Sequence, residues 1–286
     1  MRGPLRFTAP RILPSFAGIA VKPVGGGPAR VLAWPVMRES YSKQVLDELL
    51  AGARTRRGWD FTGMNELRQP VPWDYLEVVP RYLRPSDAVL DVGTGAGERL
   101  RDLAPCFGHG LGIDADHEMV RLARENPSPG NLSFQVCSEQ LESVPGGFDV
   151  ILDRHAPFDL SAIAARLRPG GYFITQQVGE RNMACVKAAL GQAPDPPPIQ
   201  RQPIAASGLR LLAFMEYNVE YVVRDIESLV FWLNALDASH ADLDGKSALA
   251  SAASLNRVLA GNVDERGFVT NEHRYLAIAQ CVRQRA

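Results

Sequence analysis

The sequence predicts an α/β fold with a mostly parallel sheet and helices on both of its faces. An apolar segment at residues 88–92 runs directly into a turn with three glycines at alternate positions, Gly93, Gly95 and Gly97. From there to residue 178, apolar segments of strand length alternate with segments of helical periodicity, and this alternation is typical of a parallel sheet. Glycine permits positive φ and close approach of a ligand, and the next helix offers unpaired N–H groups. We therefore expect a nucleotide-like ligand on a Rossmann-type sheet.

The elements of this sheet follow in a regular order. Strands are expected at residues 88–92, 109–114, 132–137, 148–153 and 172–178. Helices are expected at residues 117–123 and 160–167, and the second is stopped by a proline and two glycines at 169–171. Further alternating segments at 217–223 and 271–279 are expected to be strands, separated by a helix at 228–236.

The glycine turn differs from that of dinucleotide-binding proteins. Their Gly-x-Gly-x-x-Gly fingerprint would place its third glycine at Glu98, whereas the third glycine here is Gly97. Asp91 stands two positions before Gly93. The resulting pattern, Asp-x-Gly-x-Gly-x-Gly, resembles motif I of class I S-adenosylmethionine (SAM)-dependent methyltransferases. This resemblance implies SAM as the cofactor and methyl transfer as the activity.

Later segments narrow the resemblance. Residues 72–75, 153–155 and 175–179 are similar to those of a largely uncharacterised bacterial branch of these enzymes, and the similarity runs from about residue 59 to the C-terminus. The resemblance implies a Rossmann-like, seven-stranded, mostly parallel sheet whose final hairpin is antiparallel. It implies no particular substrate.

Acidic and polar residues at the ends of two strands are the candidate nucleoside ligands. Asp114 ends the second strand, where a carboxylate can accept hydrogen bonds from both ribose hydroxyls; its alternative role is that of a helix N-terminal acid. Many relatives bind the adenine amino group with an aspartate after the third strand, and here that position is Cys137. Cysteine is a poor acceptor, so we expect adenine to rest on Ser138, Glu139 and apolar packing. The full set of predicted cofactor-binding residues is Asp91, Gly93, Thr94, Gly95, Gly97, Asp114, Ala115, Cys137, Ser138 and Glu139.

The turn after the fourth strand holds the candidate catalytic residues. It lacks the Asp/Asn-Pro-Pro-Tyr/Phe sequence typical of enzymes that methylate base amino groups, so such an acceptor is disfavoured. His155 is the candidate general base, because it follows the carboxyl end of a strand where open α/β sheets bind ligands; otherwise it bonds the loop or faces water. Asp153 is expected to orient His155, assist the acceptor or cap the next helix. Methyl transfer from a sulfonium needs no metal, and no histidine or cysteine has metal-ligand spacing.

Composition restricts the partners. The chain has 286 residues and a formal charge of −1, yet residues 1–38 contain six basic residues and no acid, which leaves the remainder acidic. An acidic body disfavours nucleic acid as the main partner. No apolar run reaches the ~18 residues of a membrane helix, so no membrane association is expected. The four cysteines are far apart and predict no disulfide, which favours a reducing, cytoplasmic location.

Three regions are expected along the chain. Residues 1–36 are rich in proline, glycine and arginine and are expected to be disordered. They are expected to be either a targeting segment or a stretch absent from the native protein, whose translation would then begin near Met37. Residues 37–85 are expected to form an N-terminal helical cap with helices at 41–50 and 73–83. Residues 86–286 are expected to form the core, with a helical insertion near 237–262. Aromatic residues of the cap are candidate walls of an acceptor pocket: Trp59, Phe61, Trp73 and Tyr75.

The prediction is therefore SAM-dependent methyl transfer to an oxygen or nitrogen of a small molecule. One alternative keeps the fold and takes RNA or protein as the acceptor. Another alternative is a non-catalytic SAM-binding regulatory protein, because Cys137 replaces the aspartate that binds adenine in many relatives. The sequence does not predict the oligomeric state.

Overall fold

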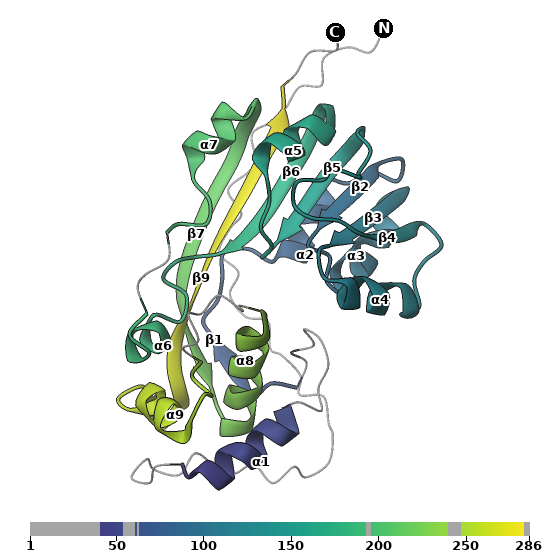
Figure 1. Ribbon diagram of the computed structural model, residues 1–286. Coiled ribbons are helices and arrows are strands. Elements are labelled where there is room, and N and C mark those ends of the chain that lie inside the picture. Colours follow the sequence, from purple (N-terminus) through teal and green to yellow (C-terminus); the bar gives the residue numbers. More distant parts are fainter. Residues whose placement is uncertain (1–40, 54–60, 62, 193–195, 240–246, 283–286) are drawn as a thin grey trace, which may run out of the picture. The chain divides into compact units, whose positions relative to one another are not determined.

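The computed structural model describes residues 41–53, 61, 63–192, 196–239 and 247–282 (Figure 1). The segment at 1–36 that the sequence predicts to be disordered lies outside these residues, and so does Trp59.

The α/β fold is confirmed. Five parallel strands form one side of the sheet: β4 (Leu132–Val136), β3 (His109–Asp114), β2 (Ala88–Val92), β5 (Phe148–Arg154) and β6 (Leu167–Val178), in that spatial order. Strand β9 (Gly267–Cys281) then pairs antiparallel with β6 on one side and with β7 (Leu209–Val223) on the other. The sheet is thus mostly parallel and ends in the expected antiparallel hairpin.

The expected number of seven strands was too low. Among the described residues, two short strands are added at the hairpin: β1 (Glu66–Arg68) pairs with β7, and β8 (Val263–Asp264) pairs with β9. The three residues of β1 are all exposed, so they lack the apolar alternation by which a strand is identified from sequence.

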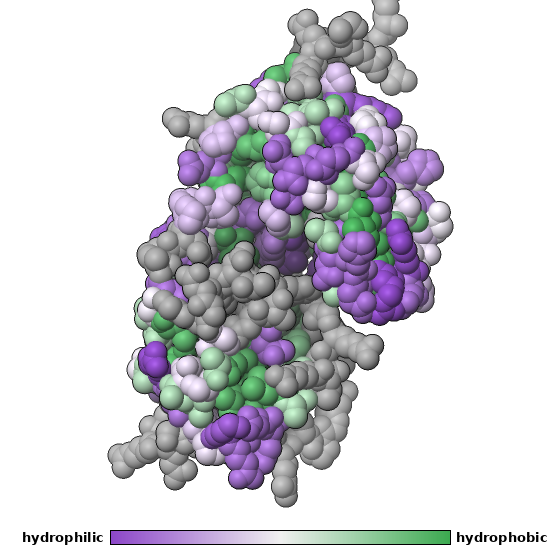
Figure 2. Space-filling model, viewed as in Figure 1, coloured by the Kyte–Doolittle hydropathy of each residue, from purple (hydrophilic) through white to green (hydrophobic). Residues whose placement is uncertain are grey.

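Alternating residues of the central strands point into two apolar layers. Leu90, Ile151 and Phe173 pack on one face, together with helix α5 (Leu160–Arg166) and helix α7 (Arg201–Ala206). On the other face, Val89, Val150 and their neighbours pack with α2 (Tyr75–Val78), α3 (Glu98–Leu103) and α4 (His117–Glu125). Burial of both faces explains why these strands are almost continuously apolar. Hydrophilic residues gather over the outer side of α4 (Figure 2), where Arg121 forms ion pairs with Glu118 and Glu125.

Strands β7 and β9 continue beyond β6 and contribute to a third apolar core (Figure 1). Strand β9 pairs with β6 only over residues 274–280, but with β7 as far as Phe268. The outer parts of the two strands pack with α1 (Lys43–Ala53), α6 (Ala184–Ala189), α8 (Ile226–Ser239) and α9 (Ala252–Leu259). The helix expected at 41–50 is α1, and α9 lies within the insertion expected at 237–262.

The segment expected to be one helix at 73–83 is shorter and divided. Helix α2 gives way to the 3-10 helix η1 (Val79–Tyr82), which has Pro80 in its first turn, because proline cannot donate the backbone bond that would continue an α-helix. A second 3-10 turn, η2 (Ala104–Cys106), follows α3. Within the described ranges, no helix has the length and apolar character needed to span a membrane.

Candidate functional site

The glycine turn lies between β2 and α3, and its three glycines have different surroundings. All three have positive φ, at 69° for Gly93, 57° for Gly95 and 81° for Gly97. A Cβ at Gly93 would lie 2.1 Å from the Cβ of Ala156, and one at Gly97 would lie 2.8 Å from the Phe134 ring. A Cβ at Gly95 would meet nothing within 4 Å. Gly93 and Gly97 are therefore required by packing, whereas Gly95 faces space that a ligand can occupy.

Asp114 holds the turn in place and keeps free acceptor capacity. Its Oδ2 accepts a 2.8 Å hydrogen bond from the Gly95 N–H, and its Oδ1 accepts a 2.9 Å bond from the Asp116 N–H. Each carboxylate oxygen has a further lone pair, so both ribose hydroxyls of a nucleoside can still be bound. The N-cap of α4 is Asp116, whose side chain accepts from the Glu118 N–H, so Asp114 is not the capping residue of this helix.

The residues predicted to hold adenine lie beside Asp114. Asp114 is paired with Val136 in the sheet, and the Cys137 N–H donates to the Asp114 carbonyl at 3.0 Å. The Cys137 side chain is buried, and its sulfur accepts from Ser143 Oγ at 3.4 Å. Ala115 is exposed next to Asp114, while Ser138 and Glu139 are partly exposed. The structure thus brings the predicted nucleoside ligands together at one edge; their contacts with adenine stay predictions.

Two buried carboxyl groups lie at the ends of β2 and β5. Burial raises the pKa of Asp91 to about 7, although the Thr94 hydroxyl opposes this shift. Burial also raises the pKa of Asp153 well above its usual value, against the hydrogen bond that its Oδ1 accepts from Thr175 Oγ1 at 2.9 Å. Within the described part of the chain, Asp153 Oδ2 and the Tyr75 hydroxyl are buried without a hydrogen-bond partner.

The structure places the two predicted catalytic residues differently. Asp153 Oδ1 accepts from Thr175 and Gln177, no bond to His155 is formed, and Asp159 is the residue that caps α5. Three roles were expected for Asp153. Assistance to the acceptor is the role that is still possible, because among the described residues Oδ2 has no hydrogen-bond partner. His155, in contrast, lines a cavity.

His155 is held firmly and is neutral near pH 7. It has a φ of 65°, and its N–H donates to the Gln176 carbonyl at 2.8 Å. The Gln176 Oε1 accepts from the Trp73 indole N–H at 2.9 Å, so the Gln176 amide nitrogen faces His155 Nε2, 3.1 Å away. Nε2 is therefore an acceptor in this arrangement, and the ring proton is on Nδ1. Burial, together with the charges of Arg154 and Arg274, lowers the pKa of His155 well below its ordinary value.

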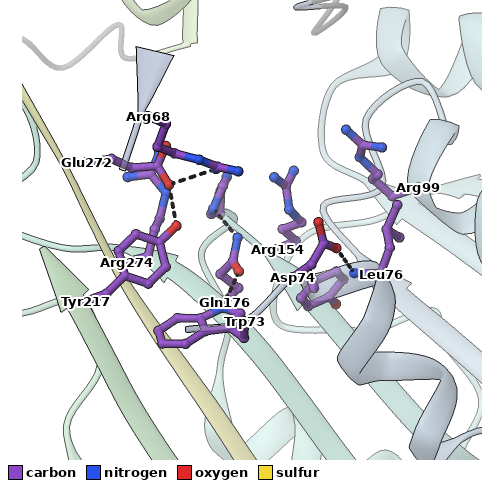
Figure 3. A pocket seen from close by; sticks show the side chains of 12 residues that line it. Arg68, Trp73, Asp74, Leu76, Arg99, Arg154, Gln176, Tyr217, Glu272 and Arg274 are labelled. Carbon is purple, nitrogen blue, oxygen red and sulfur yellow. Dashed lines mark hydrogen bonds and ion pairs between the residues drawn. The ribbon is translucent and has the colours of Figure 1, made fainter. Parts of the chain in front are cut away.

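The cavity has a volume of about 150 Å³, and its lining includes Arg154, the last residue of β5, and Gln176, near the carboxyl end of β6 (Figure 3). Of the candidate aromatic walls, Trp73 and Tyr75 line it. Phe61 instead packs against Phe231, with 5.5 Å between ring centroids, in the third core. The remaining lining residues are mostly polar or charged: Arg68, Asp74, Leu76, Arg99, Arg154, His155, Gln176, Tyr217, Glu272 and Arg274.

The four arginines of this cavity were not predicted from the sequence. They lie on β1, at the start of α3, at the end of β5 and on β9. Arg154 stands beside His155 and Arg99 follows the glycine turn, but no motif surrounds Arg68 or Arg274. Only the strand order, which the sequence does not contain, brings them together.

Comparisons with known proteins agree with this architecture. Residues 89–171, which include the glycine turn, Asp114 and the turn after β5, match the family model described as "Methyltransferase domain". Among curated proteins, the ribosomal protein L11 methyltransferase of Geobacter metallireducens is 36% identical over 92 residues, which is 30% of each chain. That of Geobacter sulfurreducens is 32% identical over 124 residues, which is 41% of each chain. The matches thus span about a third of the length of these relatives.

Solved structures show the same fold at low sequence identity. A protein of unknown function from Deinococcus radiodurans R1 is 19% identical with a TM-score of 0.52, and the match covers 83% of this chain and 99% of the other. A candidate methyltransferase from Bacillus halodurans C-125 is 14% identical with a TM-score of 0.51, covering 73% and 97%. The family match identifies residues 89–171 as a methyltransferase domain, and the solved structures share the fold of the chain. The cofactor that this family match implies is SAM.

The residues at the glycine turn fit SAM. Asp114 has acceptor capacity for the ribose, and Gly95 leaves open space beside it. The ammonium of the methionine part of SAM needs acceptors, and the unpaired Asp153 Oδ2 and the buried Asp91 lie at the neighbouring strand ends. The roles of the individual residues remain predictions.

Proposed function

We propose that the protein transfers the methyl group of SAM to an oxygen or nitrogen of a small molecule bound in the cavity. The observation that carries this proposal is a cavity of about 150 Å³ next to the glycine turn. It is lined by Tyr75, which lies near Asp91, and by His155, whose neighbour Ala156 packs against Gly93. An engineered protein cavity of about 150 Å³ holds benzene, so this cavity has room for a group of ring size. Its four arginines disfavour a cationic amine as the acceptor.

In this mechanism, the chain's residues bind and orient the reactants. SAM supplies an activated methyl group and leaves as a neutral thioether. Asp114 and the glycine turn position the cofactor, and the cavity aligns the acceptor for in-line displacement, a source of up to roughly 7–11 kcal/mol of barrier reduction. The acceptor's proton passes to a base, and His155 is the proposed residue; its Nε2 lone pair becomes available when the Gln176 amide rotates away.

A second candidate acceptor is a protein. The curated relatives named above are methyltransferases of ribosomal protein L11. Their similarity extends over 30–41% of their length, so it supports the cofactor-binding part more than the acceptor-binding part.

The cofactor can be tested directly by calorimetry with SAM and with NAD. Micromolar SAM binding without any NAD response is the expected result, and it would justify a screen of acceptors for production of S-adenosylhomocysteine. NAD binding, or the absence of SAM binding, would contradict the proposal.

Replacing His155 with alanine is expected to slow turnover about 10²-fold while leaving SAM affinity unchanged, because general-base catalysis contributes about 10²–10⁴-fold. The rate of the unmodified protein should stay level as pH falls from 8 to 6.5, since the pKa of His155 lies well below 6.5. Steady-state rates with a confirmed acceptor provide the measurement. His117→Ala, at an exposed position on α4, is the control, and equal rates for both variants would remove His155 from the mechanism.

SAM binding is expected to weaken as pH falls below about 7. The pKa of Asp91 is raised to about 7 by burial, and an adjacent cationic ligand favours the ionised carboxylate, so binding at lower pH must expel a proton. The loss approaches tenfold per pH unit. Calorimetry at pH 7 in two buffers of different ionisation enthalpy measures this proton release. Asp91→Asn should abolish it, and a pH-independent affinity would show that Asp91 does not face the cofactor.

A further inference from the structure

The charges of the cavity do not balance. Four arginines and only two acidic residues, Asp74 and Glu272, line it in the described part of the chain. Glu272 is already engaged: it accepts from Arg68 at 3.4 Å and from the Tyr217 hydroxyl. Arg99 pairs with Asp102, outside the cavity, at 3.2 Å. Two guanidinium groups therefore remain without a carboxylate partner.

These two groups belong to Arg154 and Arg274. Over the described ranges, the partly buried Arg154 side chain has no hydrogen bond or ion pair; its Cζ lies 6.0 Å from the centre of the Tyr75 ring. Among the residues that the structure describes, Arg274 donates to two neutral oxygens only, Asn182 Oδ1 at 2.6 Å and the His273 carbonyl at 2.8 Å. In the view of Figure 3, the Arg154 side chain lies between Arg99 and the Arg68–Glu272 pair. A guanidinium withdrawn from water is costly unless an anion accompanies it.

The cofactor does not supply this anion. The sulfonium and the ammonium of SAM carry two positive charges and its carboxylate one negative charge, so SAM adds a net positive charge. Its one carboxylate cannot balance both guanidinium groups, so negative charge is still required from the acceptor. The cavity wall also offers apolar surface from Trp73, Tyr75 and Tyr217 for an organic body.

We infer that the methyl acceptor is a small organic anion, a carboxylate or phosphate monoester of ring size, bound by Arg154 and Arg274. This inference rests on the proposed function and specifies its substrate class. The anionic group lies at the two arginines, and the nucleophile lies on the side of Tyr75 and the glycine turn.

Benzoate and phenyl phosphate are suitable probes, with benzamide as the neutral counterpart. Binding is measured by calorimetry to the full chain at saturating SAM, so that the methionine carboxylate already occupies its own site. At least one anion is expected to bind tenfold or more tightly than benzamide, and the better of the two identifies the anionic group. Arg154→Gln and Arg274→Gln should each weaken anion binding about tenfold without affecting benzamide.

Two sets of controls accompany these variants. Arg154→Lys and Arg274→Lys keep the charge and should restore part of the affinity. Arg210→Gln makes the same charge change on β7, away from the cavity lining, and should have no effect. Among the described residues, Arg154 has no hydrogen-bond or ion-pair partner to lose, so its Gln variant should fold normally, which a melting curve checks.

Three outcomes would overturn the inference. One is equal binding of benzoate and benzamide. Another is a loss of SAM affinity in Arg154→Gln and Arg274→Gln with unchanged anion affinity, which would assign both arginines to the cofactor. The third is displacement of benzoate by a single-stranded hexaribonucleotide much more readily than by a mononucleotide, which would indicate RNA. Titrations of the anions without SAM separate the two proposals. If the protein binds the anions but not SAM, only the proposed methyl transfer is contradicted. If it binds SAM but not the anions, only the anion site is contradicted.

Discussion

Replacing Asp114 with alanine is expected to weaken SAM binding about 10²-fold or more. The carboxylate has lone pairs free for two ribose hydroxyls, and a hydrogen bond to a charged group contributes about 1.5–3 kcal/mol. The variant also loses the bond from the Gly95 N–H that shapes the turn. Two lost ribose bonds therefore correspond to at least two powers of ten in Kd. Calorimetric titration with SAM measures the change.

Asp149→Ala is the matched control for this variant. Asp149 also accepts a backbone hydrogen bond, from the Ala88 N–H at 2.9 Å, but it lies at the opposite end of the parallel strands and pairs with Arg168. Its loss should lower the melting temperature and leave SAM affinity unchanged. Unaltered SAM affinity in Asp114→Ala would show that the ribose lies elsewhere.

Gly93→Ala is expected to destabilise the fold by about 3 kcal/mol or more, whereas Gly95→Ala should cost only about 1–2 kcal/mol. Both residues have positive φ, which costs an alanine about 1–2 kcal/mol. At Gly93 the new Cβ would also lie 2.1 Å from the Cβ of Ala156, and overpacking adds about 1–3 kcal/mol. At Gly95 the new Cβ enters open space.

The two variants should therefore separate stability from binding. Each kcal/mol lost from the free energy of unfolding lowers the melting temperature of a chain of this size by roughly 2–4 °C. Gly93→Ala should therefore melt about 6–12 °C lower than the unmodified protein. Gly95→Ala should melt only a few degrees lower but bind SAM at least tenfold more weakly. Melting curves without ligand, followed by SAM titrations, test both statements. Equal melting temperatures for the two variants would contradict the contact between the glycine turn and the turn after β5.

The grouping of the predicted cofactor-binding residues could be predicted because these residues are close in sequence. The pattern from Asp91 to Gly97 and the acid at Asp114 occupy consecutive strand–turn–helix units, and parallel pairing of β2 with β3 brings them together. Most strands of the sheet were predictable because each has a local apolar pattern, whereas the exposed strand β1 has none. The division of the segment at 73–83 into α2 and η1 was not predicted, because the apolar periodicity of this segment continues across Pro80.

The cavity proposed to bind the acceptor was not predictable, because its residues are brought together by pairing between distant segments. Arg68 lies on a three-residue exposed strand without a periodic pattern, and it reaches Glu272 across more than half of the chain. Arg274 is one of several polar residues on a strand of mixed character. Their shared cavity follows from strand order, which no single-sequence pattern contains.

The extension of β7 and β9 beyond β6 has an evolutionary consequence. Arg68, Tyr217, Glu272 and Arg274 come from the hairpin and its edge strand, outside residues 89–171, which contain the cofactor turn. Substitutions in the hairpin can therefore alter the choice of acceptor while the glycine turn and Asp114 stay as they are. Proteins that resemble this chain only within residues 89–171 are under no structural obligation to share its substrate.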